Sequence, residues 1–139
     1  MFDFRDKLVC GTEPSQYSPL ALAYLGDCVY EIFIRTKLVG KANMQVNKLN
    51  KNGSNLAMAV TQAAMVDALE DFLSDEEKLY IQRGKNAKVG GIPKSCTARE
   101  YHKATGFETL MGYLFLSRRD ERIEEIILTG WKRIGVDNE

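Results

Sequence analysis

Apolar residues recur at intervals of three and four along most of the chain, which is the spacing of one face of an α-helix. The sustained alternation of apolar and polar residues that is typical of β-strands is missing. Ser18 and Pro19 predict a helix start, with serine at the cap and proline in the first turn, for a helix that runs to about Leu38. A second helical region is predicted over residues 43–73, with a bend near 52–54, where Asn-Gly-Ser interrupts the pattern.

The rest of the chain predicts further helices around one long loop. Ser74 and Thr97 are each followed three residues later by glutamate, which is the capping-box pattern that opens a helix. Between these two helices, residues 85–96 include two glycines and a proline and are expected to form an exposed loop. A last amphipathic helix is predicted over 120–134. The predicted fold class is therefore all-α, a bundle of five or six helices.

Size and composition predict a single domain over residues 1–139. A chain of 139 residues, of which 45% are hydrophobic, has enough apolar surface for one core. The first residues, which include Asp3 and Asp6, lack the basic start and the apolar run of a signal peptide. No later stretch is apolar for long enough to span a membrane. We therefore expect a cytoplasmic protein with no membrane partner.

Cysteine and histidine content exclude several classes of chemistry. The three cysteines, Cys10, Cys28 and Cys96, are odd in number and far apart, so the chain has neither a disulfide framework nor a CxxC metal site. Because His102 is the single histidine, a zinc site built on histidines and a Ser-His-Asp triad are both excluded. Carboxylates, lysines or a bound metal ion are left to carry any catalysis.

Charge is distributed unevenly, although the net charge is zero. Residues 35–51 contain five lysines and arginines and no acid, and residues 83–103 contain six against Glu100 alone. Acidic residues concentrate in 67–77 and 120–125. A molecule polarised in this way presents a phosphate-attracting face without being basic as a whole.

Three acids stand inside helices that are otherwise apolar. Asp27 and Glu31 lie one turn apart in the first long helix, which is apolar nearly all round and is expected to be buried, and Glu108 is surrounded by apolar residues in a later helix. An unpaired carboxylate in such surroundings costs several kcal/mol, so each acid requires an ion pair, access to water or a metal ion. If Asp27 and Glu108 face each other across the bundle, they suit a cation that prefers oxygen, Mg²⁺ or Mn²⁺.

The residues around these acids resemble a known family. The segment LAYLGDCVYEIF around Asp27 resembles the signature helix of the ribonuclease III family, and GFETLMGYLFL around Glu108 resembles its second catalytic helix. The similarity is closer to the short bacterial branch, Mini-ribonuclease III, because RGKNAK at 83–88 is followed by Pro93 and Lys94. The motif LGD alone is weak evidence, whereas LGD, RGKNAK, PK and GFE in this order are specific, and the resemblance covers nearly the whole chain.

The resemblance implies a homodimeric endonuclease domain that cleaves double-stranded RNA with Mg²⁺, leaving 5′ phosphates and 3′ hydroxyls. It also implies maturation of large-subunit (23S) ribosomal RNA precursors. By position, Asp27 and Glu108 correspond to catalytic and metal-binding acids. Ala23 and Thr105 stand where longer family members have a glutamate and an aspartate, which matches the short branch but leaves open whether one or two ions act. Glu31 fills neither position and is assigned a structural or hydrogen-bonding role in preference to a metal ligand.

RNA contacts are expected mainly from a basic loop over residues 85–99. A lysine-rich loop is by itself often only a solubilising surface, but the family resemblance of RGKNAK and PK favours RNA binding. Lysines suit phosphates, and an asparagine suits a 2′-hydroxyl or a base edge. Lys48 and Lys51 are weaker candidates. The predicted RNA-binding residues are Arg83, Lys85, Asn86, Lys88, Lys94 and Arg99.

Two other functions compete with the enzyme. The first is a catalytically weak or inactive module that binds structured RNA during ribosome assembly, since two of the four family acids are missing. The second is a helical protein–protein adaptor, which leaves the uneven charge unexplained. The aromatic residues Tyr24, Tyr113 and Phe115 are assigned to the core or a dimer interface rather than to base stacking, and Cys28 to the role of a small buried hydrophobe.

Overall fold

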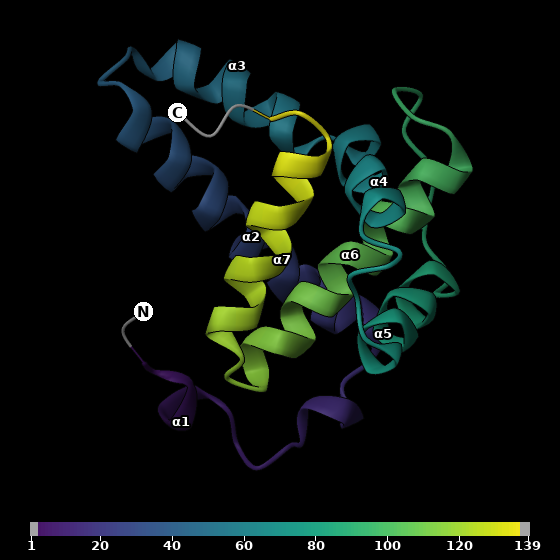
Figure 1. Cartoon of the computed structure of the whole chain (residues 1–139). Helices are drawn as coiled ribbons and strands as arrows, with labels where there is room; N and C mark the ends of the chain where they lie inside the picture. Colours follow the sequence, from purple (N-terminus) through teal and green to yellow (C-terminus); the bar gives the residue numbers. More distant parts are fainter. Residues whose placement is uncertain (1–2, 137–139) are drawn as a thin grey trace.

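The structure, a computed structural model, describes residues 3–136 and is built of helices (Figure 1). The described residues contain no strand, so the predicted all-α class is confirmed. The single domain predicted over residues 1–139 stays a prediction. The elements in chain order are α1 (Arg5–Leu8), the 3-10 turn η1 (Pro14–Gln16), α2 (Pro19–Lys41), α3 (Val46–Ala57), α4 (Ala59–Ala68), α5 (Asp75–Lys85), α6 (Ala98–Leu116) and α7 (Asp120–Arg133).

The predicted helix starts are confirmed at all three capped positions. Ser18 precedes α2, and its side chain accepts a hydrogen bond from the backbone N–H of Ala21 at 3.2 Å. Full capping boxes open α5 at Ser74 and α6 at Thr97, because in both cases the glutamate three residues on accepts a hydrogen bond from the N–H of the capping residue. Each cap satisfies backbone donors that the helix itself leaves unpaired.

The predicted bend near residues 52–54 is wrong. The helix continues through these residues as α3, and the chain turns at Met58, whose φ and ψ of −59° and 145° are not helical. Gly53 is buried inside α3, where a Cβ would lie 3.5 Å from the side chains of Ile34 and Leu38 on α2. This is an ordinary packing distance, so α3 packs on α2 at Gly53 and the glycine does not end the helix. The described residues contain seven α-helices, with the short α1 included, whereas five or six helices were predicted.

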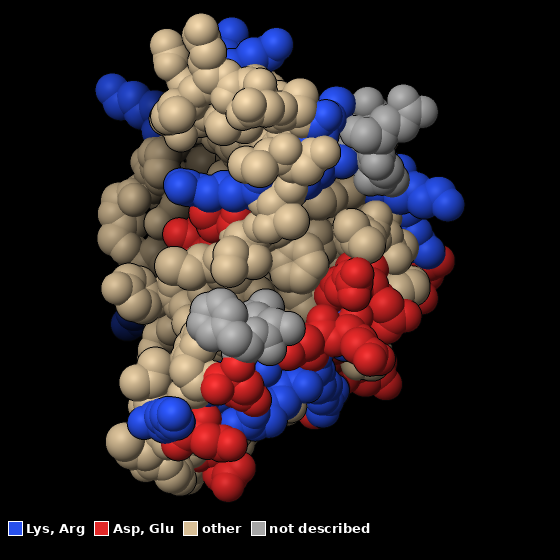
Figure 2. All heavy atoms as spheres, turned by 90° about the vertical axis from the view of Figure 1, so that its left-hand side faces the viewer, with Lys and Arg blue, Asp and Glu red and all other residues tan. Residues whose placement is uncertain are grey.

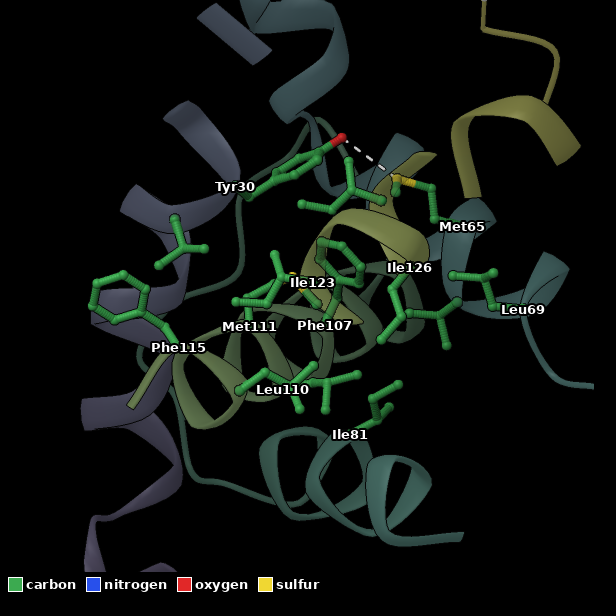
Figure 3. Close-up of a cluster of buried hydrophobic side chains, with 14 of the residues drawn as sticks. Tyr30, Met65, Leu69, Ile81, Phe107, Leu110, Met111, Phe115, Ile123 and Ile126 are labelled. Atoms are coloured by element: carbon green, nitrogen blue, oxygen red, sulfur yellow. Dashed lines mark hydrogen bonds between the residues drawn. The ribbon is translucent and has the colours of Figure 1, made fainter. Parts of the chain in front are cut away.

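Helix α6 lies at the centre of the bundle, with α2, α4, α5 and α7 around it (Figure 1). It contributes Phe107, Leu110 and Met111 to the middle of the hydrophobic core (Figure 3). From α2, Tyr30 reaches the same core, where its hydroxyl donates to the Leu56 carbonyl at 2.8 Å. Other core side chains that Figure 3 labels are Met65, Leu69, Ile81, Phe115, Ile123 and Ile126.

Helices α2 and α6 cross in direct backbone contact. A Cβ at Gly26 would overlap the carbonyl oxygen of Glu108, and a Cβ at Gly112 would overlap the carbonyl oxygen of Leu22. Only glycine at both positions allows the two helices to approach this closely. The crossing fixes the residues that flank these glycines relative to one another.

A second crossing of the same kind joins α5 to the opposite part of α6. A Cβ at Gly84 would lie 2.7 Å from the Cα of Gly106, and a Cβ at Gly106 would lie 2.5 Å from the carbonyl oxygen of Ile81. Helix α6 is therefore held through backbone contacts by α2 along one side and by α5 along another.

The prediction that α2 is buried all round is wrong for one of its faces. Tyr24 is 85% exposed, and Leu20, Cys28 and Ile32 are exposed on the same face. Cys28 is thus not the buried small hydrophobe that we predicted. Tyr113 and Phe115 do lie in the core. The all-round apolar pattern of α2 reflects one face that packs on α6 and a second face that the described residues leave uncovered.

Candidate active site

Asp27 and Glu108 come together at the α2–α6 crossing. Asp27 directly follows Gly26, and the backbone of Gly26 faces the backbone of Glu108. The two carboxyl groups are near enough for Asp27 to raise the pKa of Glu108. Asp27 is exposed and Glu108 is half-buried, so the pair sits at the surface end of the crossing. The side chains that the sequence predicted to face each other therefore do so, and their separation is set by backbone contact.

Burial and the neighbouring Asp27 carboxyl raise the pKa of Glu108 to about 8. Burial penalises the ionised form of Glu108, and the hydrogen bond and the negative charge of Asp27 disfavour it further. A hydrogen bond from Gln62 acts in the opposite direction but is the weakest of these influences. A carboxyl group that keeps its proton because a second acid lies beside it is placed to exchange that proton for a cation.

Gln62 on α4 is the third polar side chain at this place. It is buried, with 2% of its surface exposed. Its amide nitrogen donates to the carbonyl of Ala57 at 2.9 Å and to Oε2 of Glu108 at 3.4 Å. Its amide oxygen is buried and has no hydrogen-bond partner among the described residues. The sequence did not single out Gln62, although a glutamine inside the apolar run AVTQAAMV is a signal that could have found it.

The other acid of α2 lies apart from this pair. Glu31 accepts a hydrogen bond from Nε of Arg35 at 3.2 Å, an ion pair within one helix turn. Among residues 3–136, no group of three or more histidines, cysteines and acids is arranged to hold a metal. Ala23 and Thr105, at the positions where longer family members have acids, are both buried. The acidic part of the site therefore consists of two carboxylates.

These donors fit a divalent ion that prefers oxygen. Asp27 and Glu108 offer carboxylate oxygens from facing helices, and Gln62 adds a buried amide oxygen with no other partner in the described structure. Mg²⁺ binds through one or two protein carboxylates and keeps several waters, so a site with two carboxylates satisfies its needs.

The predicted RNA-binding residues surround the loop between α5 and α6. Arg83 and Lys85 are half-buried at the end of α5, and the guanidinium of Arg83 lies over the ring of Tyr80, 5.1 Å from its centre. Asn86, Lys88, Lys94 and Arg99 are exposed, either in the loop or in the first turn of α6.

A shallow groove connects this basic region to α2. Arg83, Asn86 and Lys88 line it together with the start of α2 at Ser18 to Leu20. Leu20 and Asp27 share a face of α2, because residues seven apart lie two turns along the same side of a helix, about 10 Å along the axis. The groove and the carboxylate pair are therefore consecutive features along one helix face.

Charge is separated only in part over the surface. On the face drawn in Figure 2, acidic side chains gather in the lower and right-hand parts. Basic side chains are spread over the upper part and also lie between the acids below. Several acids and bases of the described residues are paired with each other, for example Arg119 with Glu76 at 2.8 Å. The sequence therefore overstated the polarisation, because it could not show which charges neutralise one another.

Known proteins are similar to this chain over most of its length. Residues 20–119 match the model of the ribonuclease III domain. The chain is 44% identical over 110 residues to Mini-ribonuclease 3 of Thermoanaerobacter sp. (strain X514), a match that covers 79% of this chain and 78% of that protein. It is 40% identical over 126 residues to Mini-ribonuclease 3 of Enterococcus faecalis, with coverage of 89% and 96%.

A solved structure is similar over most of its length. The crystal structure of a Fusobacterium nucleatum protein superposes with a TM-score of 0.78 at 32% sequence identity, over 87% of this chain and 94% of that one. Among the described residues, none of the helices combines the length and the apolar character needed to cross a membrane. The chain therefore belongs to the ribonuclease III family, as one of its short members, and is a ribonuclease III-type endonuclease of double-stranded RNA.

Proposed function

We propose that this enzyme hydrolyses RNA phosphodiesters with Mg²⁺ held by Asp27 and Glu108, and leaves 5′ phosphates and 3′ hydroxyls. The observation that carries the proposal is the carboxylate pair at the glycine crossing of α2 and α6. Two acids that are 81 positions apart in the sequence (108 − 27 = 81) meet at an exposed place, beside a buried amide that also contacts one of them. Mn²⁺ is expected to substitute for Mg²⁺, since both ions take oxygen ligands.

Each residue of the pair has a distinct part in this chemistry. A bound Mg²⁺ supplies a lowered pKa for the attacking water and neutralises charge on the leaving oxygen. Asp27, which is exposed, is placed to contact both the ion and the substrate side of the site. Glu108 must give up its proton to bind the ion, because its pKa of about 8 keeps it protonated at neutral pH in the free protein.

We propose that the duplex lies along the face of α2 between the basic loop and the carboxylate pair. A-form RNA is recognised by its shape, through phosphates and 2′-hydroxyls, and the exposed Lys88 and Lys94 suit phosphates. The groove between Arg83 and the start of α2 supports this path. Lys85, Asn86 and Arg99 extend the basic contact surface on either side of the loop.

We also propose that the enzyme is a homodimer joined through the uncovered side of α2 that carries Tyr24, Cys28 and Ile32, next to the side with Leu20 and Asp27 along which the duplex lies. Tyr24, Cys28 and Ile32 expose an apolar surface there, and Leu128 on α7 is exposed beside the groove that Ile32 lines. A two-fold dimer places the same patch of both subunits in contact and gives each RNA strand its own carboxylate pair. We expect analytical ultracentrifugation of the protein to give a molar mass about twice that of one chain.

A cleavage assay tests the proposed function. Purified protein and a labelled duplex RNA are incubated with Mg²⁺ or with chelator, and we expect cut ends only with Mg²⁺. Asp27→Asn and Glu108→Gln each remove one ion ligand and should lower the rate at least about a thousandfold, while RNA binding persists. Glu31→Gln is the matched control, since Glu31 pairs with Arg35, and its rate should stay within a few-fold of the unaltered enzyme.

Other outcomes of this assay overturn parts of the proposal. A stable complex without cleavage products would favour the RNA-binding module. Normal turnover of the Asp27→Asn enzyme would remove the carboxylate pair from the mechanism.

For the biological substrate we propose precursors of large-subunit (23S) ribosomal RNA in the cytoplasm. Cells that lack the enzyme should accumulate such precursors with extended ends.

A further inference from the structure

Gln62 is held rigidly beside Glu108, although it lies on a different helix. Its amide nitrogen is shared between the Ala57 carbonyl, at the junction of α3 and α4, and Oε2 of Glu108 on α6. With 2% of its surface exposed, the side chain has no room to leave this position. The contact at 3.4 Å places an N–H donor against Oε2 of the Glu108 carboxyl group.

The other end of the Gln62 amide lacks a partner within residues 3–136. Its Oε1 is buried and accepts no hydrogen bond there. A buried polar atom that is left unsatisfied costs about 1–3 kcal/mol, so native proteins rarely keep one without a functional reason. An apolar side chain of similar length would avoid this cost. The position lies one helical turn from the buried Met65 and Val66. An amide oxygen is also able to bind Mg²⁺ directly or to accept a hydrogen bond from one of the waters of the ion.

We propose that Gln62 is a positioning residue of the ion site, which orients the Glu108 carboxylate through its N–H group and presents its free carbonyl oxygen to the hydrated cation. This inference rests on the proposed function, because it assumes that Asp27 and Glu108 hold the ion. It assigns a role to a residue outside the acidic motifs of the two helices. Residues that orient a metal ligand commonly change metal affinity by about 10- to 100-fold when they are replaced.

Metal binding in the absence of RNA tests the proposal directly. Mn²⁺ is titrated into the protein and followed by calorimetry and by the paramagnetic resonance signal of free Mn²⁺. Gln62→Met keeps the length and the apolar part of the side chain but loses both polar atoms, and it should weaken Mn²⁺ binding by about tenfold. The control Gln82→Met removes a glutamine that is exposed on α5 and should leave the affinity unchanged.

A second variant separates positioning from a packing role. Gln62→Glu keeps an oxygen donor at the same place and adds a charge, so it should bind Mn²⁺ at least as tightly as the unaltered protein. In addition, saturating Mg²⁺ should restore most of the kcat of Gln62→Met. If Gln62 only fills space, Gln62→Met and Gln62→Glu will both change the melting temperature, and both will bind Mn²⁺ as tightly as the unaltered protein.

The outcomes also separate this inference from the proposed function. If the unaltered protein binds Mn²⁺ and Asp27→Asn does not, the carboxylate site stands. Equal Mn²⁺ affinity of Gln62→Met and the unaltered protein would then overturn the role of Gln62 alone. If Asp27→Asn binds Mn²⁺ as tightly as the unaltered protein, the proposed ion site itself fails.

Discussion

The α2–α6 crossing and the loop between α5 and α6 are opposite ways to build a functional surface. At the crossing, glycines bring two backbones into contact, and the reactive side chains project from positions that cannot shift independently. In the loop, Lys88 and Lys94 project into solvent from a segment without regular structure. On the proposed function, chemistry that depends on ångström-scale geometry is placed on rigid helices, and contacts with a long charged polymer are placed on an exposed loop.

The largest effect is expected from Gly26→Ala, which forces the crossing apart. The added methyl group would overlap the backbone of Glu108, so we expect a loss of about 3 kcal/mol in the free energy of unfolding and loss of cleavage. Gly40→Ala, near the end of the same helix, adds a methyl group in open space and should stabilise the protein by about 0.5–1 kcal/mol. Urea denaturation measures both.

The Gly26→Ala and Gly40→Ala variants test whether the carboxylate pair depends on the close contact between α2 and α6. If Gly26→Ala keeps its stability and cleaves RNA normally, the carboxylate pair does not depend on backbone contact. The crossing would then be no more rigid than the loop in functional terms.

A pH effect on the metal-free protein is expected next. Glu108 has a pKa of about 8 in the folded protein and an ordinary value of 4.5 when unfolded, so the folded state holds an additional proton between these values. The free energy of unfolding should therefore fall as the pH rises from about 4.5 to about 8. In Glu108→Gln this component of the slope should disappear, as urea denaturation at several pH values in the presence of chelator will reveal.

The smallest effect is expected in the loop, where each contact contributes independently. Replacing Lys88 and Lys94 by alanine should weaken duplex binding about tenfold and reduce the slope of log Kd against log salt by about 1.5, because fewer counterions are released. Replacing the exposed Lys7 and Lys132 on α1 and α7 is the matched control. Equal losses in the two double variants would show that charge alone, and not the loop, attracts the RNA.

Local signals in the sequence predicted the helices well. The caps at Ser18, Ser74 and Thr97 were correct because a cap depends on residues within one turn of one another. The bend near 52–54 was wrong because Gly53 serves a contact with α2, and a residue's partner in another helix is not visible in the local pattern.

The site was only partly predictable for the same reason. Asp27 and Glu108 were noticed because acids are unusual in apolar helices, and the structure does bring them together. Gln62 was missed because its meaning lies in a contact 46 positions away along the chain. The exposed face of α2 was missed because an apolar face at the surface of the chain has the same sequence composition as one that is buried.

Helix α6 is wedged between α2 and α5 by glycine contacts on two sides, and this has a mechanical consequence. One contact sits beside the acids, and the other sits beside the end of α5, where Arg83 and Lys85 begin the basic region. On the proposed function, the placement of the basic region relative to the acids is therefore set by the packing of α2 and α5 on α6. Replacing loop side chains leaves that helix packing unchanged.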